Sequence, residues 1–360
     1  MKKYLNSVIT GSGHFLPKNV VKNSDFLNKV FYDGTTGKPL DRPMEDIIDK
    51  FVAITEIEER RWIDNDMVNS DMGKIAGEKA IEDAGIDKND LDYIIVAQNF
   101  GDVAYGTNKT DIMPSISSKI KHKMDIRNSS CIPYDMLYGC PGWIEGMRMA
   151  DQFIQAGLAK NILVIATETL SRIIDPFDRD SMIFADGAGA VVLSAKESDE
   201  KYGILAHNTI SDNNEELNYL YNDKSFNPDY QPNNSFMRMI GRKIYEYALT
   251  KVPAAIKLSI DDAGLHLDDT SKLLIHQANG KMDEQILKRF VRLYKGKVAD
   301  DYMPMTIAKF GNSSVATVPT MFDLINKKQL DNHEFNSGDN IVFASVGAGM
   351  TINSMVYKFK

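Results

Sequence analysis

Cysteine is scarce in this chain of 360 residues, which contains only Cys131 and Cys140. These two residues form no C-x-x-C pair, so the sequence suggests neither a zinc site nor a disulfide framework. No apolar run approaches the roughly 18 residues of a membrane span. The first residues also lack the apolar region of a signal peptide. We therefore expect no membrane association and a cytoplasmic protein, since a catalytic thiol survives in a reducing compartment.

Positive charge is also in deficit, because 42 Lys and Arg residues stand against 50 Asp and Glu residues. The resulting net charge of −8 argues against general nucleic-acid binding, although a local basic patch remains open. Hydrophobic residues make up 43% of the chain, which supports a large core. The length is sufficient for two lobes of ordinary domain size.

Cys140 lies in a segment that predicts the start of a helix. Pro141 suits the first helical turn, and Gly139 allows the backbone to turn sharply before it. A thiol at a helix N-terminus meets unpaired N–H groups, which favour the thiolate and can also accept an oxyanion. From this local pattern alone, a small buried cysteine that caps a core helix is an equally good interpretation.

The chain contains an internal repeat at an offset of 179 positions. Segments 81–98 and 260–277 both predict a helix that ends at a glycine, Gly85 or Gly264, followed by a loop and a buried strand. A second match pairs segment 184–192 with segment 343–352 after one inserted residue. The repeat predicts two related α/β halves, residues 1–198 and residues 199–360, divided within the charged stretch 196–201.

The repeat also reveals an asymmetry, because Ala97 in the first half corresponds to His276 in the second. This difference favours a functional site in one half, with a satisfied core histidine as the alternative. Segment 211–236 is rich in Asn, Asp and Tyr and is predicted to be a long surface excursion. The G-A-G segments at 187–189 and 347–349 are not a G-x-G-x-x-G fingerprint, so nucleotide binding is weakly supported.

Four segments carry a resemblance to a known family. They are Asp175-Pro-Phe-Asp-Arg179, Phe184-Ala-Asp-Gly-Ala-Gly-Ala190, His276-Gln-Ala-Asn279 and Gly311-Asn-Ser-Ser-Val-Ala-Thr-Val-Pro319. In these segments the chain resembles the thiolase-like condensing enzymes, and more narrowly the β-ketoacyl-acyl-carrier-protein synthase III family. The resemblance runs from about residue 9 to the C-terminus. It implies an α/β fold of five αβαβα layers, built from two pseudo-symmetric halves, and a homodimer.

The resemblance also implies a catalytic trio, Cys140, His276 and Asn312. Cys140 would take an acyl group from a thioester, while its N–H and the loop Gly347-Ala348-Gly349 hold the oxyanion. His276 and Asn312 would donate hydrogen bonds to a malonyl thioester as it loses CO2, and desolvation would keep the imidazole neutral. The partners would be acyl-carrier protein, acyl-CoA and malonyl thioesters, with no metal and no further cofactor.

The predicted entrance for coenzyme A departs from the family pattern. The family's T-G-I-x-x-R segment has Glu56 in place of its glycine, and Ile54 replaces an arginine that meets phosphates. Lys50 replaces a tryptophan that stacks on adenine, whereas Arg179, the other adenine-stacking residue, is present. The resemblance therefore implies CoA contacts at Arg179 and Lys50, with the lysine acting as a point charge toward phosphate.

The predicted acyl pocket and docking surface differ from the family pattern too. Met113 stands where the family often has a phenylalanine that limits the partner subunit's acyl chain, so a longer or bulkier primer is expected. Tyr138 and Trp143 beside the nucleophile either reshape the pocket or pack the core. A cluster of basic residues after His276 predicts docking of an acidic carrier protein, with a solvated face as the alternative. The predicted docking residues are Lys281, Lys288 and Arg292.

The function predicted from these residues is decarboxylative condensation that starts fatty-acid or related chains. The alternative is a secondary-metabolite, polyketide-like ketosynthase or an acyltransferase on the same scaffold. A hydrolase would use the same thiol and histidine. A non-catalytic subunit is disfavoured, because Cys140, His276 and Asn312 are all retained.

Overall fold

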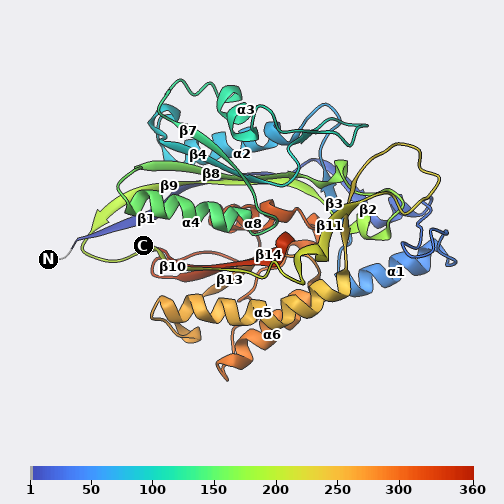
Figure 1. Ribbon diagram of the computed structural model, residues 1–360. Coiled ribbons are helices and arrows are strands. Elements are labelled where there is room, and N and C mark those ends of the chain that lie inside the picture. Colours follow the sequence, from blue (N-terminus) through green and yellow to red (C-terminus); the bar gives the residue numbers. More distant parts are fainter. Residues whose placement is uncertain (1–2) are drawn as a thin grey trace.

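Two mixed β-sheets form the centre of the protein, as the computed structural model shows for residues 3–360 (Figure 1). The first sheet has five strands in the order β1-β9-β8-β4-β7, and the second has four in the order β10-β15-β14-β13. The strands of the first sheet are β1 (Tyr4–Phe15), β9 (Asp186–Ser198), β8 (Asn161–Thr169), β4 (Tyr93–Gln98) and β7 (Ile132–Leu137). Those of the second are β10 (Gly203–Ser211), β15 (Thr351–Lys358), β14 (Asn340–Gly347) and β13 (Lys272–Ile275).

Helices cover the outer faces of both sheets and fill the space between them (Figure 1). One hydrophobic core joins α4 and α8 to strands of both sheets, a second joins α5 and α6 to the second sheet, and a third joins α2 and α3 to the first sheet. This arrangement confirms the predicted αβαβα layers. The helices are α2 (Asn69–Ala84), α3 (Ile116–Lys123), α4 (Gly142–Gln155), α5 (Gly241–Asp262), α6 (Gly280–Leu293) and α8 (Thr317–Asn326).

Smaller elements surround the end of the molecule where the site lies. Three two-stranded sheets pair β2 with β3, β5 with β6 and β11 with β12. These elements are β2 (Asn19–Lys22), β3 (Glu59–Trp62), β5 (Asp102–Val103), β6 (Thr110–Asp111), β11 (Leu220–Asp223) and β12 (Phe236–Met239), with the helices α1 (Met44–Thr55) and α7 (Ile307–Phe310).

The repeat found in the sequence corresponds to matching elements of the fold. The strand order β10-β15-β14-β13 repeats the order β1-β9-β8-β4, so the halves are pseudo-symmetric. The first match is correct in position: Gly85 and Gly264 follow α2 and α5 with φ of 63° and 72°, a conformation that favours glycine. The first sheet ends at Ser198 and the second begins at Gly203, while the predicted boundary at 198/199 stays a prediction.

The second sequence match is wrong as a structural equivalence. Phe184 precedes β9, whereas Phe343 lies inside β14, whose counterpart by strand order is β8. Small residues occur in both segments for a local reason, namely close approach of other backbone. A Cβ on Gly189 would lie 2.7 Å from the Thr320 nitrogen of α8, and a Cβ on Gly347 would lie 2.6 Å from the Cys140 nitrogen.

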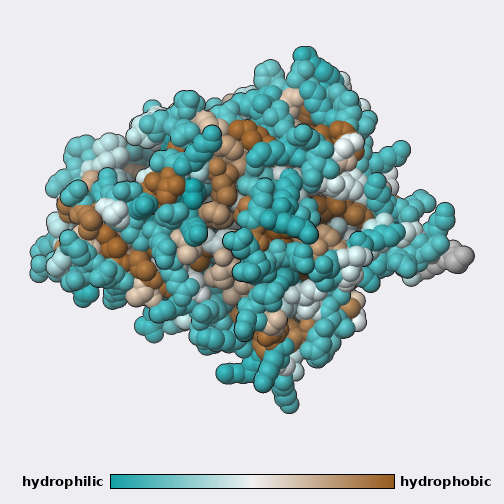
Figure 2. All heavy atoms as spheres, turned by 180° about the vertical axis from the view of Figure 1, so that it is seen from behind, coloured by the Kyte–Doolittle hydropathy of each residue, from teal (hydrophilic) through white to brown (hydrophobic). Residues whose placement is uncertain are grey.

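The face of the molecule seen from behind in Figure 2 is mostly hydrophilic, with hydrophobic residues in several separate patches between hydrophilic side chains. Within residues 3–360, no helix has both the length and the apolar character needed to cross a membrane.

Candidate active site

Cys140 lies in the turn between β7 and α4. Gly139 has φ of 71°, and its carbonyl accepts a hydrogen bond from the Gly142 nitrogen at 3.0 Å. Pro141 is the N-cap and Gly142 the first helical residue, so α4 begins one residue later than the sequence predicted. The turn places the Cys140 thiol 3.3 Å from the Ser314 hydroxyl.

The prediction of a thiolate at Cys140 is wrong for this structure. Burial, with a smaller contribution from the nearby Glu168 carboxyl, raises the pKa of the thiol to about 11, while the hydrogen bond from Ser314 opposes this rise. Desolvation therefore outweighs the partial charges of the first helical turn. The thiol is neutral at pH 7 before substrate arrives.

His276 directly follows β13 and is neutral, as predicted. Its backbone nitrogen donates to the Ala344 carbonyl at 2.8 Å, which holds it at the end of the second sheet. The side chain is 4% exposed, and burial lowers its pKa to about 4, with the Ser314 backbone opposing this shift. A neutral imidazole has an N–H that can donate to a substrate carbonyl without carrying charge into the cavity.

Asn312 is fixed through both its backbone and its side chain. The backbone nitrogen donates to the Ile183 carbonyl at 2.9 Å, and the carbonyl accepts from the Ala185 nitrogen at 2.8 Å. The side-chain Oδ1 accepts from the Ser314 nitrogen at 2.8 Å. This contact fixes the orientation of the amide, and Nδ2 donates no hydrogen bond within residues 3–360, so it is available to a ligand.

These three residues line one cavity of about 50 Å³ together with Gly347. The rest of the wall is apolar except for Ser314 and contains four flexible methionine side chains, which adapt readily to different ligand shapes. The other lining residues are Leu170, Phe184, Leu220, Met237, Met239, Ile244, Ala278, Met282, Ser314, Val346 and Met350.

The loop Gly347-Ala348-Gly349 packs directly against the nucleophile turn. A Cβ on Gly347 would meet the Cys140 backbone, and a Cβ on Gly139 would lie 2.8 Å from the Ala348 nitrogen. Gly349 has φ of 71°, which favours glycine. The loop is therefore close enough to share an oxyanion with the Cys140 N–H, and that role stays a prediction.

The other residues of the His276 segment have structural roles that the sequence did not reveal. The Gln277 side chain donates to the Pro304 carbonyl at 2.7 Å and accepts from the Thr306 and Ile307 nitrogens. Asn279 caps α6, since its side chain accepts from the Met282 nitrogen at 3.1 Å. These contacts fix the strand end from which His276 projects.

The predicted CoA residues do not line this cavity. Lys50 and Arg179 are both exposed, and the Arg179 Nε lies 3.9 Å from an Asp180 oxygen. Any contact they make with a nucleotide would lie at the surface. Glu56, which replaces the family's glycine, has φ of 62° at the end of α1, which explains why glycine suits that position.

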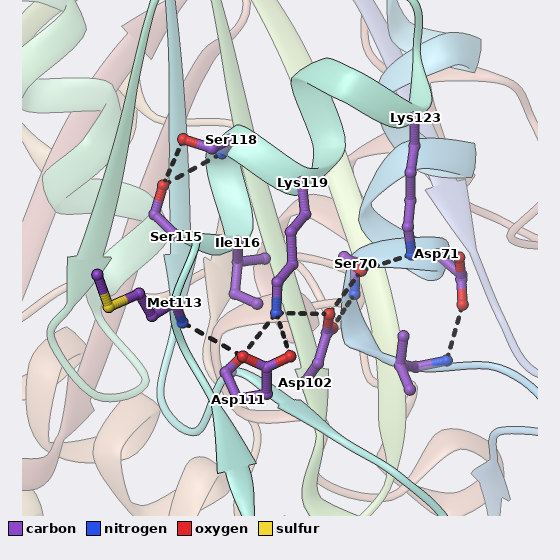
Figure 3. Close-up of polar contacts among 12 residues, drawn as sticks. Ser70, Asp71, Asp102, Asp111, Met113, Ser115, Ile116, Ser118, Lys119 and Lys123 are labelled. Carbon is purple, nitrogen blue, oxygen red and sulfur yellow. Dashed lines mark hydrogen bonds and ion pairs between the residues drawn. The ribbon is translucent and has the colours of Figure 1, made fainter.

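The predicted acyl-pocket residues Met113 and Tyr138 do not line the cavity within one chain either. Met113 is 89% exposed and follows β6, where its nitrogen donates to Asp111 (Figure 3). Tyr138 is partly buried in the turn before the nucleophile. Trp143 is a core residue, 1% exposed and edge-on to Phe343, so the packing interpretation holds for it.

The predicted surface excursion, 211–236, and the residues directly after it form a wall of the site. Leu220 of β11, inside the excursion, lines the cavity, as do Met237 and Met239 of β12, which follow its end. Between the two methionines, Arg238 points the opposite way and is 2% exposed. The alternation Phe-Met-Arg-Met in 236–239 is the signal that could have identified a strand with two distinct faces.

Arg238 anchors this wall to the Asp175–Arg179 segment. Its guanidinium forms ion pairs with Asp175 at 2.5 Å and with Asp178 at 2.8 Å, and it lies 3.6 Å from the centre of the Phe226 ring.

A further buried acid, Glu168, and its partner Asn99 lie beside Cys140 and were also missed by sequence reasoning. Among residues 3–360, no cluster of three or more His, Cys, Asp or Glu side chains is placed to hold a metal ion.

The five layers, with a cysteine at a helix start facing a buried histidine and asparagine, define the class of thiolase-like condensing enzymes. The family model for 3-oxoacyl-[acyl-carrier-protein] synthase III matches residues 134–213, and its C-terminal counterpart matches residues 260–359. The chain belongs to this family and is an acyltransferase of the condensing type, which confirms the resemblance seen in the sequence.

Similar proteins support this assignment along the whole chain. A β-ketoacyl-[acyl-carrier-protein] synthase III of Staphylococcus haemolyticus is 32% identical over 357 residues, 99% of each chain. A β-ketoacyl-[acyl-carrier-protein] synthase III of Vibrio vulnificus is 31% identical over 98% of this chain and 99% of its own. The crystal structure of the Aquifex aeolicus 3-oxoacyl-[acyl-carrier-protein] synthase III superposes with a TM-score of 0.78 and 26% identity, covering 98% of this chain and all of that one.

Proposed function

We propose that this protein starts acyl chains in two steps, acylation of Cys140 and decarboxylative condensation with a malonyl thioester. The observation that carries the proposal is the shared cavity of the thiol, the neutral imidazole of His276 and the free amide donor of Asn312. The secondary-metabolite alternative is not favoured, since the full-length relatives are named as synthase III enzymes.

In the first step, the Cys140 sulfur attacks the carbonyl carbon of an acyl thioester. A carbon–sulfur bond forms to the enzyme, the bond to the donor sulfur breaks, and the thiol proton leaves with the donor as its thiol. The negative charge of the tetrahedral intermediate is held by the Cys140 N–H and the adjacent glycine loop. Preorganised donors of this kind typically contribute about 10²–10³ in rate each.

In the second step, His276 and Asn312 donate hydrogen bonds to the carbonyl oxygen of the malonyl thioester. The malonyl carbon–carbon bond breaks, CO2 leaves, and the enolate charge develops at that oxygen. The enolate carbon attacks the acyl group, a new carbon–carbon bond forms, and Cys140 is released and takes up a proton. Neutral donors suit this step because they stabilise the oxygen without protonating the carbanion.

For the carrier protein, we propose docking at the exposed face of α6. Lys281 and Arg292 are exposed, and within residues 3–360 neither forms an ion pair, whereas Lys288 is paired with Glu284 at 3.0 Å. Lys281 directly follows Gly280 at the helix start, close in sequence to His276.

CoA donors would reach the same cavity past Lys50 and Arg179. Thioester chemistry needs no metal or further cofactor, and a free thiol fits a cytoplasmic protein.

We further propose a homodimer formed along β7. This strand is an edge of the first sheet, and Ile132, Tyr134 and Leu137 are 39%, 42% and 60% exposed. Asp135 of the same strand accepts hydrogen bonds from the Ile116 and Ser117 nitrogens, so the segment that carries Met113 lies beside this edge. A partner strand here would cover the open backbone edge and place Met113 against the other subunit.

Intact-mass measurements test the reaction directly. The protein is incubated with a panel of acyl-CoAs and acyl-carrier proteins, with Cys140→Ala as one variant and Cys131→Ser as the matched thiol control. A mass gain that is lost in Cys140→Ala and kept in Cys131→Ser supports the proposal. No gain with any donor contradicts it.

Addition of a malonyl-carrier protein to the acylated protein then tests condensation. Asn312→Ala is expected to acylate normally and to condense about 10²–10³ times more slowly, because only the enolate loses a donor. Lys281→Glu combined with Arg292→Glu should slow reaction with carrier-protein donors and leave CoA donors unaffected. Equal slowing with both donor types would contradict docking on α6.

A further inference from the structure

A buried carboxyl group with no role in the proposed steps lies next to the nucleophile. Glu168 of β8 is 0% exposed, and its Oε1 is buried without a hydrogen-bond partner among the described residues. The other oxygen, Oε2, accepts a hydrogen bond from the Asn99 side-chain amide. Burial of a carboxyl group costs folding free energy unless each of its oxygens is hydrogen-bonded or paired. The position of Glu168 beside the nucleophile therefore calls for an explanation.

Asn99 connects this acid to the thiol through one further side chain. Its Nδ2 also lies 3.0 Å from the Ser314 hydroxyl oxygen, which in turn lies 3.3 Å from the Cys140 sulfur. An amide nitrogen can only donate, so the Ser314 oxygen accepts from Asn99 and directs its own hydrogen toward the sulfur.

The orientation of the Asn99 amide is determined at both of its ends. Oδ1 accepts from the Gly139 nitrogen at 3.0 Å, and Nδ2 donates to the Glu168 oxygen. A rotation that exchanged the two atoms would place an amide N–H against the Gly139 N–H. The Gly139 backbone therefore holds the amide in the orientation that makes Ser314 a donor, and a charged Glu168 favours the same orientation.

We propose that Glu168, Asn99 and Ser314 form a hydrogen-bonded positioning chain that sets the ionisation of the Cys140 thiol. The inference rests on the proposed role of Cys140 as the nucleophile. Ser314 stabilises the thiolate by donating a hydrogen bond to it, whereas a charge on Glu168 destabilises the thiolate by repulsion. The two ends of the chain thus act on the same sulfur in opposite directions, and no covalent bond changes in the chain itself.

Other charged groups around the chain decide when Glu168 is ionised. Burial raises the pKa of Glu168 to about 8, the hydrogen bond from Asn99 opposes this, and the Asp186 carboxyl of β9 raises it. Asp186 itself faces Arg172, which follows β8, and His276 across the cavity is neutral. Glu168 is therefore mostly protonated at pH 7 and becomes charged before the thiol does.

The test follows the thiol by alkylation across pH and needs no acyl donor. In a Cys131→Ser background, the rate of reaction with iodoacetamide reports Cys140 alone. Glu168→Gln keeps the shape and the acceptor but removes the charge, so the thiol should titrate at lower pH. Its alkylation at pH 9 should be about ten-fold faster, the effect of one unit of pKa.

Two substitutions at the other end of the chain should act in the opposite sense. Ser314→Ala removes the donor to sulfur. Asn99→Asp replaces the amide donor with a carboxylate that attracts the Ser314 hydrogen away from the sulfur. Both should move the titration to higher pH and slow alkylation at pH 9 by about ten-fold, since a hydrogen bond to a charged atom is worth about that much.

Glu246→Gln serves as the matched control and should leave the titration unchanged, because Glu246 forms an ion pair with Arg242 on the surface of α5. Opposite shifts at the two ends support the chain, since general loosening would move all three variants the same way. A common direction, or no shift, overturns the proposal. If Glu168→Gln fails to fold, Glu168→Met takes its place, since it also removes the charge and should also move the titration to lower pH. Acylation of the unmodified protein is measured separately, so a failed chain with normal acylation is distinguished from failure of the proposed function.

Discussion

At the scale of single residues, the catalytic groups of the site are ionisable but uncharged at neutral pH. Most of the cavity wall is apolar, and burial keeps the Cys140 thiol and the His276 imidazole neutral. The reaction develops negative charge twice, first on an oxyanion and then on an enolate. A site without resident charge can hold each of these charges with N–H donors alone.

The neutrality of His276 makes a prediction about pH. Because its pKa is lowered to about 4, the imidazole stays neutral through pH 6 to 8, and its donor role should not titrate in that range. Decarboxylation of a malonyl thioester by the Cys140→Ala variant, which lacks the thiol, should be nearly constant from pH 6 to 8 and should fall only below about pH 5.

Stability changes in the same acidic range and must be measured alongside. In the unfolded chain this histidine takes a proton near its usual pKa of about 6.5, whereas the folded protein does so only near 4. Folding stability from this residue is therefore complete above pH 6.5 and declines toward pH 4. Circular dichroism at each pH identifies the range in which the protein is folded, and a loss of decarboxylation near pH 6.5 in folded protein would contradict the prediction.

Single residues also show how far sequence alone could lead. The helix-start pattern identified Cys140 and the asymmetry of the repeat identified His276, while the four segments that resemble the family added Asn312 and joined the three as one site. The thiol's charge was mispredicted, since the sequence reveals a helix start but not the depth of the cavity around it. Glu168 and Asn99 were missed because their contacts join residues 69 positions apart, with no local pattern to connect them.

At the scale of elements, the hairpin β11–β12 is the part of the site with the weakest sequence signal. Its strands have four residues each, and its inner face is made of Met237 and Met239. What holds it in place is a long-range ion cluster between Arg238 and two acids that lie 60 and 63 positions away. Composition suggested only a polar excursion, because the partners of Arg238 belong to another segment.

Arg238 should therefore be essential for the position of this hairpin. Arg238→Met leaves Asp175 and Asp178 buried without their cation, and breaking a buried pair in this way typically costs about 3–5 kcal/mol of stability. Urea denaturation measures the loss, and limited proteolysis should show faster cleavage within 211–236. Arg242→Met, on an 88% exposed side chain, is the control expected to leave both measurements unchanged.

The hairpin also forms one wall of the cavity, so its release has a functional consequence. In Arg238→Met, acylation of Cys140 by long acyl donors should weaken mainly through a higher KM, because substrate contacts are lost while the catalytic trio is untouched. Unchanged stability and unchanged proteolysis would show that the ion cluster does not anchor the hairpin.

At the scale of the whole molecule, the two halves share an architecture but not a function. Strand order and the glycines after α2 and α5 repeat, whereas the nucleophile belongs to the first half and His276 and Asn312 to the second. The helices α4 and α8 between the sheets bring these residues to one cavity. The repeat could be predicted from sequence because the same glycines recur at the turns after equivalent helices. The packing of the two halves against each other depends on contacts between distant segments, which no local pattern reveals.

The first sheet has one strand, β7, with no counterpart in the second sheet, and its exposed edge leads to a prediction about oligomeric state. β7 leads directly to Cys140 and presents Ile132 and Leu137 at the sheet edge, 39% and 60% exposed. Large exposed apolar residues on an open edge favour pairing with another chain. We expect a dimer by light scattering in the unmodified protein, and a monomer in the double variant Ile132→Asp, Leu137→Asp.

Leu258 offers a control, since it is 44% exposed and lies on α5, in the helix layer that covers the second sheet. Leu258→Asp should remain dimeric.

Lys119 bridges Asp102 and Asp111 at 3.3 Å and 2.9 Å and so holds the β5–β6 hairpin beside Met113 (Figure 3). If Met113 lies against the partner's acyl chain, Met113→Phe should shift the preference of the dimer to donors with shorter acyl chains. The same substitution should have no effect in the monomeric double variant. A monomeric unmodified protein, or an equal effect of Met113→Phe in both backgrounds, would contradict the proposed interface.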